Sequence, residues 1–495
     1  MRLSRLLAAA GFDVAGAGEA EVTGFAIDHR KVAPGTVFGA FQGASVNGED
    51  FIDDAVQAGA VAVVARPGAT VANALHIADA NPRRAFARLA AQFFTPVPGT
   101  IVAVTGTNGK TSTVEMTRQI WRMAGERAAS IGTLGVTTPD ESVSTGLTTP
   151  DIVTFLGNLS GLSREGVTHV AFEASSHGLT QYRNEGVRPR AAAFTNLSRD
   201  HLDYHADMED YFSAKMRLFD EVVADDGTAV VWMGAEPDDW AKRAVEHAGA
   251  RGLKVMTVGE GGETIRLAAR EPTQLGQTLA IEFGGGTRRV TLPLIGAYQA
   301  ANALVAAGLA LATGTAAETV FDALGRLQPV RGRLERAAIS PAGAPIYVDY
   351  AHTPDAIEAA IAALRPHVRA RLITVLGAGG DRDHGKRGAM GRAAAEGSSL
   401  VIVTDDNPRG EDPASIRAAV RAGAGDGARE IADRREAISA AIAEAGAGDI
   451  VLIAGKGHEQ GQIVGSGAEM RVLPFDDVTV AREYAGGQAN GSAAA

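Results

Sequence analysis

Short apolar runs recur along the chain, and most of them are followed at once by glycine or polar residues. Segments with helical spacing of apolar residues separate these runs. Such alternation predicts an α/β protein in which a mostly parallel sheet is covered by helices on both faces. The runs expected to form strands are Val61–Ala65, Ile101–Val104, Val170–Phe172, Ala191–Phe194, Ala229–Trp232, Ile346–Val348, Leu372–Leu376, Leu400–Val403 and Ile450–Ala454.

Turn-rich segments divide this pattern into units. The stretch 95–99 (Thr-Pro-Val-Pro-Gly) closes a first unit, and 327–330 (Leu-Gln-Pro-Val) ends a second one. A chain of 495 residues is also too long for one hydrophobic core. We therefore expect three α/β domains: a small N-terminal domain at 1–98, a central domain at 99–330 and a Rossmann-like C-terminal domain at 331–480. The small, polar segment 481–495 is predicted to be disordered.

Four polar turns follow the predicted strands of the third domain. They are Asp349–His352, Gly377–Asp383, Asp405–Arg409 and Gly455–Glu459. Ligands of open α/β sheets bind at the carboxyl ends of the strands. We therefore expect these turns to share one crevice.

Composition narrows the classes of function. The net charge of −11 argues against broad electrostatic binding of nucleic acid or of an anionic membrane. No apolar run approaches the ~20 residues that span a bilayer. The chain has no cysteine, which suits a reducing compartment. The apolar start of the chain stops at Gly11–Asp13, which favours an amphipathic first helix over a signal peptide. A cytoplasmic protein is the expectation.

A glycine-rich loop lies between the predicted strand Ile101–Val104 and a predicted helix at Val114–Met123. Its residues run Gly106, Thr107, Asn108, Gly109, Lys110, Thr111 and Ser112. Glycines let backbone amides turn toward phosphate oxygens, and the helix N-terminus adds partial positive charge. Lys110 is expected to reach the β- and γ-phosphates of ATP, and the Thr111 hydroxyl to bind Mg²⁺. Val104 stands where the general P-loop pattern has glycine.

This loop resembles the variant phosphate loop of two related families, the Mur ligases and the folylpolyglutamate synthetases. In both families ATP activates a carboxylate as an acyl phosphate, and an amine then captures it. The loop alone does not choose between them.

The metal-site residues follow the next strands. Glu173 comes directly after the predicted strand Val170–Phe172, His201 follows the next strand, and Lys215 lies in a predicted helix at Tyr211–Phe219. A carboxylate and a histidine at adjacent strand ends suit a second Mg²⁺ site. The ordered set resembles the central domain of the Mur ligases. That resemblance implies that Lys110, Glu173, His201 and Lys215 are catalytic, and that CO₂ carbamylates Lys215 to give a further metal ligand.

The resemblance continues into segments expected to bind ATP. Asn302, in a Gly-Ala-Tyr-Gln-Ala-Ala-Asn segment, matches the residue that contacts adenine. The segment 330–335 resembles the family's Pro-Gly-Arg-Met-Glu hinge, with Arg331 and Leu334 as departures. The resemblance implies that Arg333 approaches the phosphates and that Asp349 and His352 meet the nucleotide from the third domain. Closure of domains across the hinge would then assemble the site.

The N-terminal domain resembles the UDP-binding domain of the Mur ligases that add the third residue of the peptidoglycan stem peptide. Three positions depart from the family pattern, namely His29, Asn47 and Leu147. The resemblance implies a set of residues that bind a UDP-muramoyl dipeptide: Ile27, His29, Ala44, Ser45, Val46, Thr148, Thr149, Ser175, Gln181 and Arg183.

The attacking amine is predicted from the third domain. The motif Asp406, Asn407, Pro408, Arg409 is typical of the branch that adds meso-diaminopimelate. Arginine is a planar fork suited to a carboxylate, and lysine lacks the distal carboxylate that diaminopimelate has. The resemblance further implies that Arg382, Gly455 and Glu459 bind the amino acid.

The sequence therefore predicts an ATP- and Mg²⁺-dependent, ADP-forming ligase that acts as a monomer. Its expected substrates are UDP-N-acetylmuramoyl-L-Ala-D-Glu, meso-diaminopimelate and ATP. The alternatives are a lysine-adding homologue, a folylpolyglutamate synthetase-like ligase and an inactive nucleotide-binding scaffold. The UDP-type domain and the Asp406–Arg409 motif argue against the second. The third would be expected to lack Lys110, Glu173 or His201.

Overall fold

The computed structural model describes residues 1–486 except 15, 17, 44–45, 139, 144–147, 203, 237, 274–275 and 382. Four residues discussed above, Ala44, Ser45, Leu147 and Arg382, therefore lie outside the described residues. The chain divides into two compact units. One comprises Met1–Glu263 with Val305–Val320, and the other Thr264–Leu304 with Phe321–Ala495.

The first unit begins with a small parallel sheet of four strands in sequential order. Its buried strand β3 (Ala60–Ala65) includes the predicted run Val61–Ala65. Helix α1 (Leu3–Ala9) buries three leucines, as expected of an amphipathic first helix. The remaining elements of this part are β1 (Gly24–Ala26), β2 (Thr36–Gly39), β4 (Leu75–Ala78), α2 (Ile52–Gln57) and α3 (Pro82–Phe93).

The second sheet of this unit is parallel over six strands, in the order β12-β11-β10-β5-β9-β6, and ends with antiparallel β7 and β8. The predicted strands correspond to β5, β9, β10 and β11. The strands are β5 (Thr100–Thr105), β6 (Ala128–Gly132), β7 (Gly135–Thr137), β8 (Ser142–Val143), β9 (His169–Glu173), β10 (Ala191–Phe194), β11 (Thr228–Trp232) and β12 (Lys254–Gly259).

Helices between these strands bury apolar faces against the sheet, and acidic or hydroxyl side chains cap all of them except the helix that begins at Lys110. Asp151 caps α5 by accepting hydrogen bonds from the amides of Val153 and Thr154. The helices are α4 (Lys110–Met123), α5 (Ile152–Arg164), α6 (Ser176–Thr180), α7 (Met208–Arg217) and α8 (Asp239–Ala250).

The second unit opens with an antiparallel meander that the apolar runs did not predict. Helices α9 (Ala297–Ala312) and α10 (Ala317–Leu324) follow it in the chain. The meander strands alternate between buried and exposed residues instead of forming continuous apolar runs. They are β13 (Ile265–Thr273), β14 (Gly276–Phe283) and β15 (Gly286–Leu292).

A six-stranded sheet forms the rest of this unit, in the order β16-β17-β21-β18-β19-β20. All pairs are parallel except β16–β17, so the predicted Rossmann-like arrangement is confirmed. The strands are β16 (Glu335–Ile339), β17 (Pro345–Asp349), β18 (Leu372–Leu376), β19 (Leu400–Val403), β20 (Arg429–Glu430) and β21 (Ile450–Ala454).

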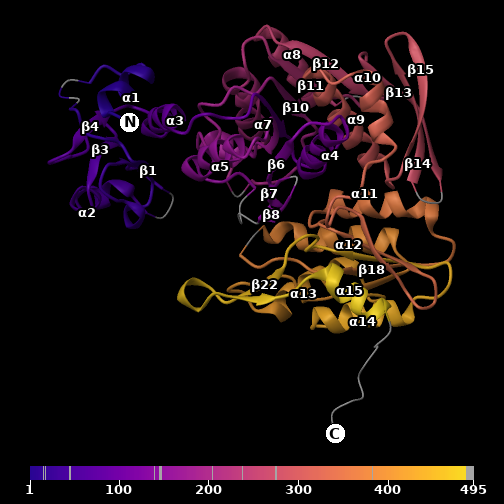
Figure 1. The fold of residues 1–495 in the computed structure, drawn as a ribbon. Helices are drawn as coiled ribbons and strands as arrows, with labels where there is room; N and C mark the ends of the chain where they lie inside the picture. Colours follow the sequence, from indigo (N-terminus) through magenta and orange to yellow (C-terminus); the bar gives the residue numbers. More distant parts are fainter. Residues whose placement is uncertain are drawn as a thin grey trace. The chain divides into compact units, whose positions relative to one another are not determined.

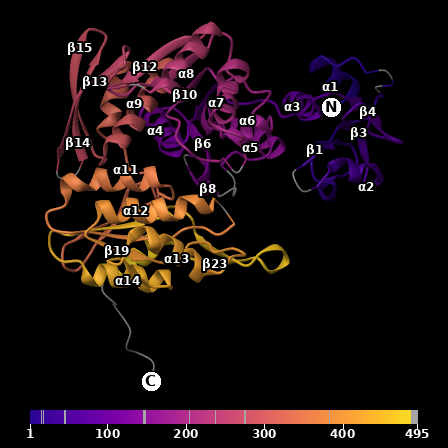
Figure 2. The ribbon, with the colours of Figure 1, turned by 180° about the vertical axis from the view of Figure 1, so that it is seen from behind.

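Successive residues of these strands pack against two different helix layers. In β21, Leu452 packs in a core with helices α11, α12 and α13, whereas Val451 and Ile453 pack in a core with α14 and α15. Figures 1 and 2 show α11 and α12 on one side of the sheet and α14 on the other. The helices are α11 (Pro354–Leu364), α12 (Arg387–Gly397), α13 (Pro413–Ala424), α14 (Arg434–Glu444) and α15 (Asp477–Ala485).

The end of the chain differs from the prediction in one respect. Helix α15 continues to Ala485, because Val478, Val480 and Ala481 are buried against the sheet. The predicted disordered segment 481–495 therefore begins too early, and residues 487–495 lie outside the described part of the chain. Among the described residues, no helix has the length and apolar character needed to cross a membrane.

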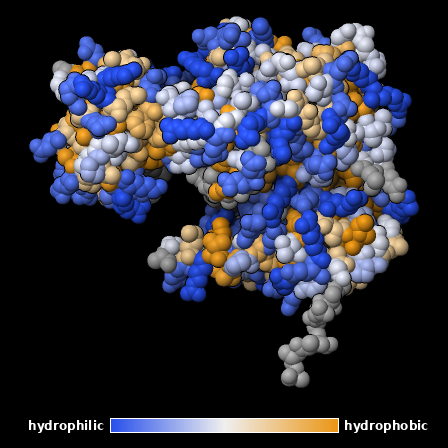
Figure 3. Space-filling view, viewed as in Figure 1, coloured by the Kyte–Doolittle hydropathy of each residue, from blue (hydrophilic) through white to orange (hydrophobic). Residues whose placement is uncertain are grey.

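A two-stranded hairpin, β22 (Gly461–Val464) and β23 (Arg471–Pro474), projects beyond the helices of this unit. Figure 3 shows apolar atoms over this hairpin, where Val472 is 61% exposed and Leu473 49% exposed. Its strands are short and pair with each other rather than with the large sheet.

One buried ion pair joins the last two helices. The side chains of Arg434 and Asp477 are 1% and 0% exposed, and the guanidinium forms two hydrogen bonds with the carboxylate, of 2.7 and 2.8 Å. Removing one partner of a buried pair leaves the other charge uncompensated.

We expect Asp477→Ala to lower the free energy of unfolding of this unit by about 3–5 kcal/mol. The neighbouring pair Arg435–Glu483 joins the same helices but is 46% and 49% exposed. Glu483→Ala should therefore cost less than about 1 kcal/mol. Denaturant unfolding of both variants measures the difference, and equal losses would contradict the assignment.

Candidate active site

The glycine-rich loop connects β5 to α4 in a conformation that requires glycine. Gly106 has φ 144°, and a Cβ there would lie 1.9 Å from the hydroxyl oxygen of Thr195. Gly109 has φ 87° and directly precedes Lys110, the first residue of α4. The strand–loop–helix context predicted for a phosphate loop is thus present.

The segment after β10 holds this loop from one side. The backbone amides of Thr107 and Asn108 each donate to Asn196, at 2.9 Å, to its carbonyl oxygen and its Oδ1 respectively. The hydroxyl of Thr195 donates to the carbonyl of Asn108 at 2.6 Å. Parallel pairing of β10 with β5 explains the contact, because it brings both strand ends to one edge.

The first turn of α4 carries the residues expected to meet phosphate and metal. Lys110 folds back over the loop, and its Nζ donates to the carbonyls of Gly106 (2.9 Å) and Thr107 (2.8 Å). Thr111 and Ser112 are both buried. The loop residues predicted from the sequence therefore form one continuous feature.

Lys215 lies directly against this loop. Its side chain is 1% exposed, and its Nζ donates to the carbonyl of Gly106 at 2.9 Å. The same nitrogen lies 4.2 Å from the ring centre of Tyr211. Burial, with the positive charge of Lys110 adding to it, lowers the pKa of Lys215 well below its usual value. The neutral amine is therefore favoured.

His201 packs among other rings in the same region. Its ring centre lies 5.0 Å from that of His177 and 6.0 Å from that of Tyr211, and its Nε2 lies 3.5 Å from Asp200 Oδ2. Burial lowers the pKa of His201 to about 4, although Asp200 opposes the shift. The imidazole is therefore neutral near pH 7, the form in which histidine binds metals.

Glu173 ends β9, where it pairs in register with Val104 of β5. Its two carboxylate oxygens accept hydrogen bonds from the backbone amide (2.7 Å) and the hydroxyl (3.1 Å) of Thr133. The Thr133 hydroxyl also lies 3.2 Å from Thr148 Oγ1, so Thr133 links Thr148 to Glu173. Among the described residues, no three His, Cys, Asp or Glu side chains cluster closely enough to bind a metal.

Four of the residues predicted to bind the dipeptide form a second cluster beside Glu173. The Thr149 hydroxyl donates to the Glu173 carbonyl at 2.9 Å and lies 3.0 Å from Ser175 Oγ. Arg183 donates to the Thr149 carbonyl at 2.8 Å and to Gln181 Oε1 at 2.8 Å. Burial lowers the pKa of Arg183.

The predicted UDP-binding residues of the N-terminal part are at the surface. Ile27 is 38% exposed and Val46 is 58% exposed. The His29 ring stacks on Phe51 with centres 4.3 Å apart and planes 1° from parallel. Since Ala44 and Ser45 lie outside the described residues, this part of the predicted set stays a prediction.

The second unit places the remaining nucleotide-binding candidates around β17. Asp349 Oδ2 accepts from the amide of Leu334 at 2.6 Å and from the hydroxyl of Tyr298 at 3.4 Å. Burial raises the pKa of Asp349 to about 6. Asn302, on α9, is also buried.

Tyr350 joins two further candidates. The Arg333 guanidinium lies 4.5 Å from the centre of the Tyr350 ring, which is within cation–π range. His352 packs against the other part of this turn, with its Nδ1 2.8 Å from the carbonyl oxygen of Tyr350.

The four turns at the strand ends meet, as the sequence predicted. Gly455 donates from its amide to the carbonyl of Asp349 at 3.1 Å, and Gly380 to that of Asn407 at 3.0 Å. Asn407 Nδ2 donates to Glu459 Oε2 at 2.7 Å. A Cβ on Gly455, where φ is 121°, would lie 2.4 Å from the carboxylate of Asp406, so a side chain is excluded there.

Arg409 is fixed through both its backbone and its side chain. Its amide donates to the Ile463 carbonyl at 3.1 Å, and its φ is 53°. Among the described residues, its side-chain hydrogen bonds both use Nη1, which donates to the carbonyls of Gly380 (2.9 Å) and Asn407 (3.4 Å). Pro408 is buried beside it. In the described part of the chain, no residue accepts a side-chain hydrogen bond from Nε or Nη2 of Arg409.

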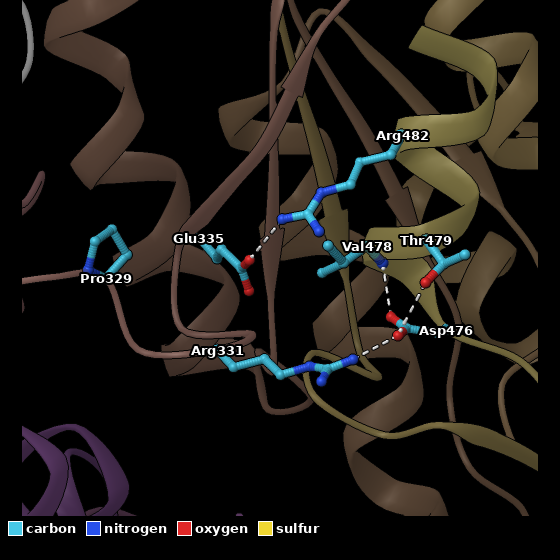
Figure 4. Close-up of a pocket in the computed structure, with 7 residues that line it drawn as sticks. All are labelled: Pro329, Arg331, Glu335, Asp476, Val478, Thr479 and Arg482. Carbon is cyan, nitrogen blue, oxygen red and sulfur yellow. Dashed lines mark hydrogen bonds and ion pairs between the residues drawn. The ribbon is translucent and has the colours of Figure 1, made fainter. Parts of the chain in front are cut away.

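Arg331, which departs from the hinge pattern of the Mur ligases, forms an ion pair in the structure. It forms an ion pair of 2.5 Å with Asp476, which caps α15, and Arg482 lies 3.4 Å from Glu335. Figure 4 shows these residues lining a pocket of about 210 Å³ with Pro329, Val478 and Thr479. Its charges pair with one another, and it contains none of the predicted binding residues.

Several residues that support the phosphate loop and the strand-end turns of the second unit were not predicted from the sequence. Asn196 and Tyr211 lie in segments with recognisable motifs, but their contacts depend on strand order. Thr133 and Tyr350 likewise reach their partners across the sheets. Only the position of Tyr211 four residues before Lys215, one helical turn away, could have been found from spacing.

The fold and the glycine-rich loop define a nucleotide-binding α/β protein of the P-loop class. Three family models match the chain: "Mur ligase family, catalytic domain" at residues 21–94, "Mur ligase middle domain" at 104–310 and "Mur ligase, glutamate ligase domain" at 332–457. The chain belongs to the Mur ligase family of ATP-dependent amide ligases.

Among its relatives, the chain is 59% identical to UDP-N-acetylmuramoyl-L-alanyl-D-glutamate–2,6-diaminopimelate ligase of Zymomonas mobilis, over 93% of this chain and 94% of that protein. A solved structure of an enzyme with the same name covers 99% of both chains, at 33% identity and a TM-score of 0.71. Folylpolyglutamate synthase of Mycobacterium tuberculosis covers 75% of this chain and 91% of its own, at 20% identity and a TM-score of 0.62, which shows the fold alone.

The pH dependence of stability tests the environment of Asp349. Because its pKa is about 6 in the folded protein and about 4 when exposed, it favours folding below pH ~4, and this contribution is lost as the pH rises through 6. We expect Asp349→Asn, which cannot ionise, to gain up to about 3 kcal/mol relative to the wild type between pH 4 and 7.5. Unfolding curves of both proteins measure this, and a difference independent of pH would contradict it.

Proposed function

We propose that this protein joins meso-diaminopimelate to the γ-carboxylate of D-Glu in UDP-N-acetylmuramoyl-L-Ala-D-Glu, with ATP converted to ADP and phosphate. The observation that carries the proposal is the position of Arg409, whose fork lies where four strand-end turns meet. The relatives named for this reaction support it over nearly the whole chain. The γ-carboxylate takes the γ-phosphoryl group of ATP and releases ADP, which gives an acyl phosphate. The diaminopimelate amine then attacks the acyl carbon, loses a proton and displaces phosphate, which leaves the amide.

The three predicted domains divide the substrates in this proposal. Residues 1–98 bind the uridine nucleotide, 99–330 bind ATP and the dipeptide, and 331–480 bind the amino acid. The dipeptide lies beside Glu173, because Thr149, Ser175 and Arg183 cluster there. The expected monomeric state and cytoplasmic location stay predictions from the sequence.

The central chemical difficulty is that a carboxylate must attack a phosphate, so two anions must meet. The loop amides and the N-terminus of α4 supply partial positive charge, and Lys110 supplies a full one. Its Nζ is at the loop, held by two carbonyls that phosphate oxygens can replace. Lys110 would then stabilise the negative charge on the phosphoryl group as it moves from ATP to the carboxylate.

The residues around the loop fit Mg²⁺. Thr111 and Glu173 offer oxygen, the neutral His201 offers nitrogen, and Mg²⁺ commonly keeps water and phosphate oxygens as its other ligands. This suits a site without a cluster of three acidic or histidine side chains. When bound, the ion neutralises charge on the phosphates.

Lys215 fits the proposed carbamate. Carbamylation by CO₂ requires a neutral amine, and burial beside Lys110 favours that form. The carbamate forms when the amine nitrogen attacks CO₂ and loses a proton. A neutral amine next to Lys110 thereby becomes an anion, which is attracted to the charge of Lys110 and adds an oxygen ligand.

Arg409 is the basis for choosing diaminopimelate over lysine. Its Nη1 is occupied by two carbonyls, which orients the guanidinium and leaves its other edge for the distal carboxylate. Lysine would leave that edge without a partner, and such a mismatch is costly in a partly buried site. Glu459 is proposed to bind the same amino acid, and for Arg382, which lies outside the described residues, this role stays a prediction from the sequence.

The alternatives explain less of the chain. A folylpolyglutamate synthetase-like ligase has the same fold over 75% of the chain, so the fold does not decide against it. The match at residues 21–94 and the Asp406–Arg409 turn favour the proposed reaction. An inactive scaffold has no need for the carboxylate, histidine and two lysines that surround the loop.

The first test of the proposal compares two amines. With ATP and the UDP-muramoyl dipeptide, the wild type should release phosphate rapidly with meso-diaminopimelate and far more slowly with lysine. Arg409→Lys should lower kcat/KM for diaminopimelate by at least about 30-fold, equivalent to about 2 kcal/mol, because a charge remains but the fork is lost.

The control for that variant is Arg421→Lys, since Arg421 is 50% exposed in the same unit. It should leave both rates unchanged. Equal turnover of the two amines by the wild type would refute the assignment of the amino acid.

The second test concerns Lys215. We expect Lys215→Ala to reduce ligase activity at least about 100-fold and short-chain carboxylates, such as acetate or propionate, to restore part of it. Lys242→Ala, which removes a lysine that is 54% exposed, is the control. Rescue by alkylamines instead of carboxylates, or a wild-type rate in Lys215→Ala, would exclude the carbamate.

A further inference from the structure

A second lysine is fully buried, in the turn that follows β21 of the six-stranded sheet rather than at the phosphate loop. Lys456 follows β21 and is 0% exposed. Its Nζ donates to Asn407 Oδ1 at 2.8 Å and to the carbonyl of Gly461 at 2.7 Å. It also lies 3.3 Å from Asp406 Oδ1. The mechanism above gives this cation no role.

We propose that Lys456 is a positioning residue for the amino-acid substrate: it fixes the side-chain amide of Asn407, and through it the carboxylate of Glu459. The inference rests on the proposed function, because it names a determinant of the same diaminopimelate site.

The hydrogen bonds of Asn407 specify one orientation of its amide. Its Oδ1 accepts from Lys456 Nζ and from the amide of Ile463, at 2.8 and 2.9 Å. Its Nδ2 donates to Glu459 Oε2 at 2.7 Å. Rotating the amide by half a turn would place its oxygen against a carboxylate and its nitrogen against two donors. Lys456 therefore contributes to holding the donor toward Glu459.

The Glu459 carboxylate is held but not enclosed. Asn407 occupies one oxygen, and the Tyr350 hydroxyl lies 3.5 Å from the other. The side chain remains 32% exposed, so it can still receive an ammonium group. Diaminopimelate carries such a group beside its distal carboxylate, for which Arg409 is proposed. Asn407 connects Glu459 to Arg409. Its side-chain amide donates to Glu459, and its backbone carbonyl accepts from Arg409 Nη1.

The positive charge of Lys456 has a second effect. Two carboxylates, Asp406 and Glu459, lie within 3.3 and 3.8 Å of its Nζ. Burial and the charge of Asp406 raise the pKa of Glu459, whereas Lys456 opposes that rise. Without the lysine, Glu459 would more readily take a proton and lose its attraction for an ammonium group.

Lys456 also joins the site to the β22–β23 hairpin. Gly461, whose carbonyl accepts from Nζ, is the first residue of β22, and Ile463 on the same strand donates to Asn407. Arg409 pairs with this strand through its own backbone. One buried ammonium group thus connects the strand to the motif that is proposed to select the amine.

The test replaces Lys456 by methionine, which has a similar length but no charge or donor. We expect the KM for diaminopimelate to rise at least tenfold, while the KM values for ATP and for the UDP-muramoyl dipeptide change less than twofold. The KM for diaminopimelate should also fall more steeply with rising pH in Lys456→Met than in the wild type, because the pKa of Glu459 is raised further without the lysine and the carboxylate regains its charge as the pH rises. A loss of structure alone would not produce that pH dependence.

Two further variants complete the comparison. Lys456→Gln retains a donor for Asn407 but has no charge, so it should raise the KM for diaminopimelate by less than Lys456→Met does. If denaturant unfolding shows that Lys456→Met does not fold, Lys456→Gln is used for the test instead. Arg371→Met is the matched control, because Arg371 forms an ion pair of 2.8 Å with the buried Asp449 at the opposite ends of β18 and β21. It should leave all three KM values unchanged.

The outcomes separate the two proposals. If the wild type does not use diaminopimelate, the proposed function fails and the inference fails with it. If the wild type uses diaminopimelate, the inference is overturned when a folded Lys456→Met keeps its KM for that substrate. It is also overturned when the KM values of all substrates rise together, or when Arg371→Met shows the same change.

Discussion

The parallel pairing of strands is the constraint on which both groups of candidate functional residues depend. In the first unit, β9 and β10 flank β5 and end at the same edge, so Glu173 and Thr195 lie beside the phosphate loop. In the second unit, β17, β21, β18 and β19 end together, and four turns meet. A shift of one residue in any of these registers would turn the terminal side chains to the other face of the sheet.

Two buried lysines show how environment decides chemical role. Lys215 faces a backbone carbonyl, an aromatic ring and the charge of Lys110, so burial favours its neutral form, which the proposed carbamylation requires. Lys456 faces Asp406, Glu459 and Asn407, so its charge is paired and it can orient the groups around it. The same side chain is thus suited to becoming a ligand in one unit and to positioning in the other.

The fold class and most core strands followed from apolar periodicity, because fully buried parallel strands form continuous apolar runs. The meander β13–β15 was missed because its strands alternate between buried and exposed residues and lack such runs. Residues at strand ends, such as Glu173 and Arg409, were predicted because motifs mark them. Supporting residues such as Thr133 and Asn196 were not, because their partners are distant along the chain and become neighbours only when the sheet forms.

The sequence by itself determined the phosphate loop, the strand ends and the types of side chain available for catalysis, since these depend on local propensity and on the order of motifs. It also predicted arginine as the selector of the amine. Only the tertiary structure decided which carbonyls hold Arg409, which way the amide of Asn407 points and that Lys456 is buried between two carboxylates. Those properties depend on distances across the sheet and on exclusion of water, neither of which is encoded in residue spacing.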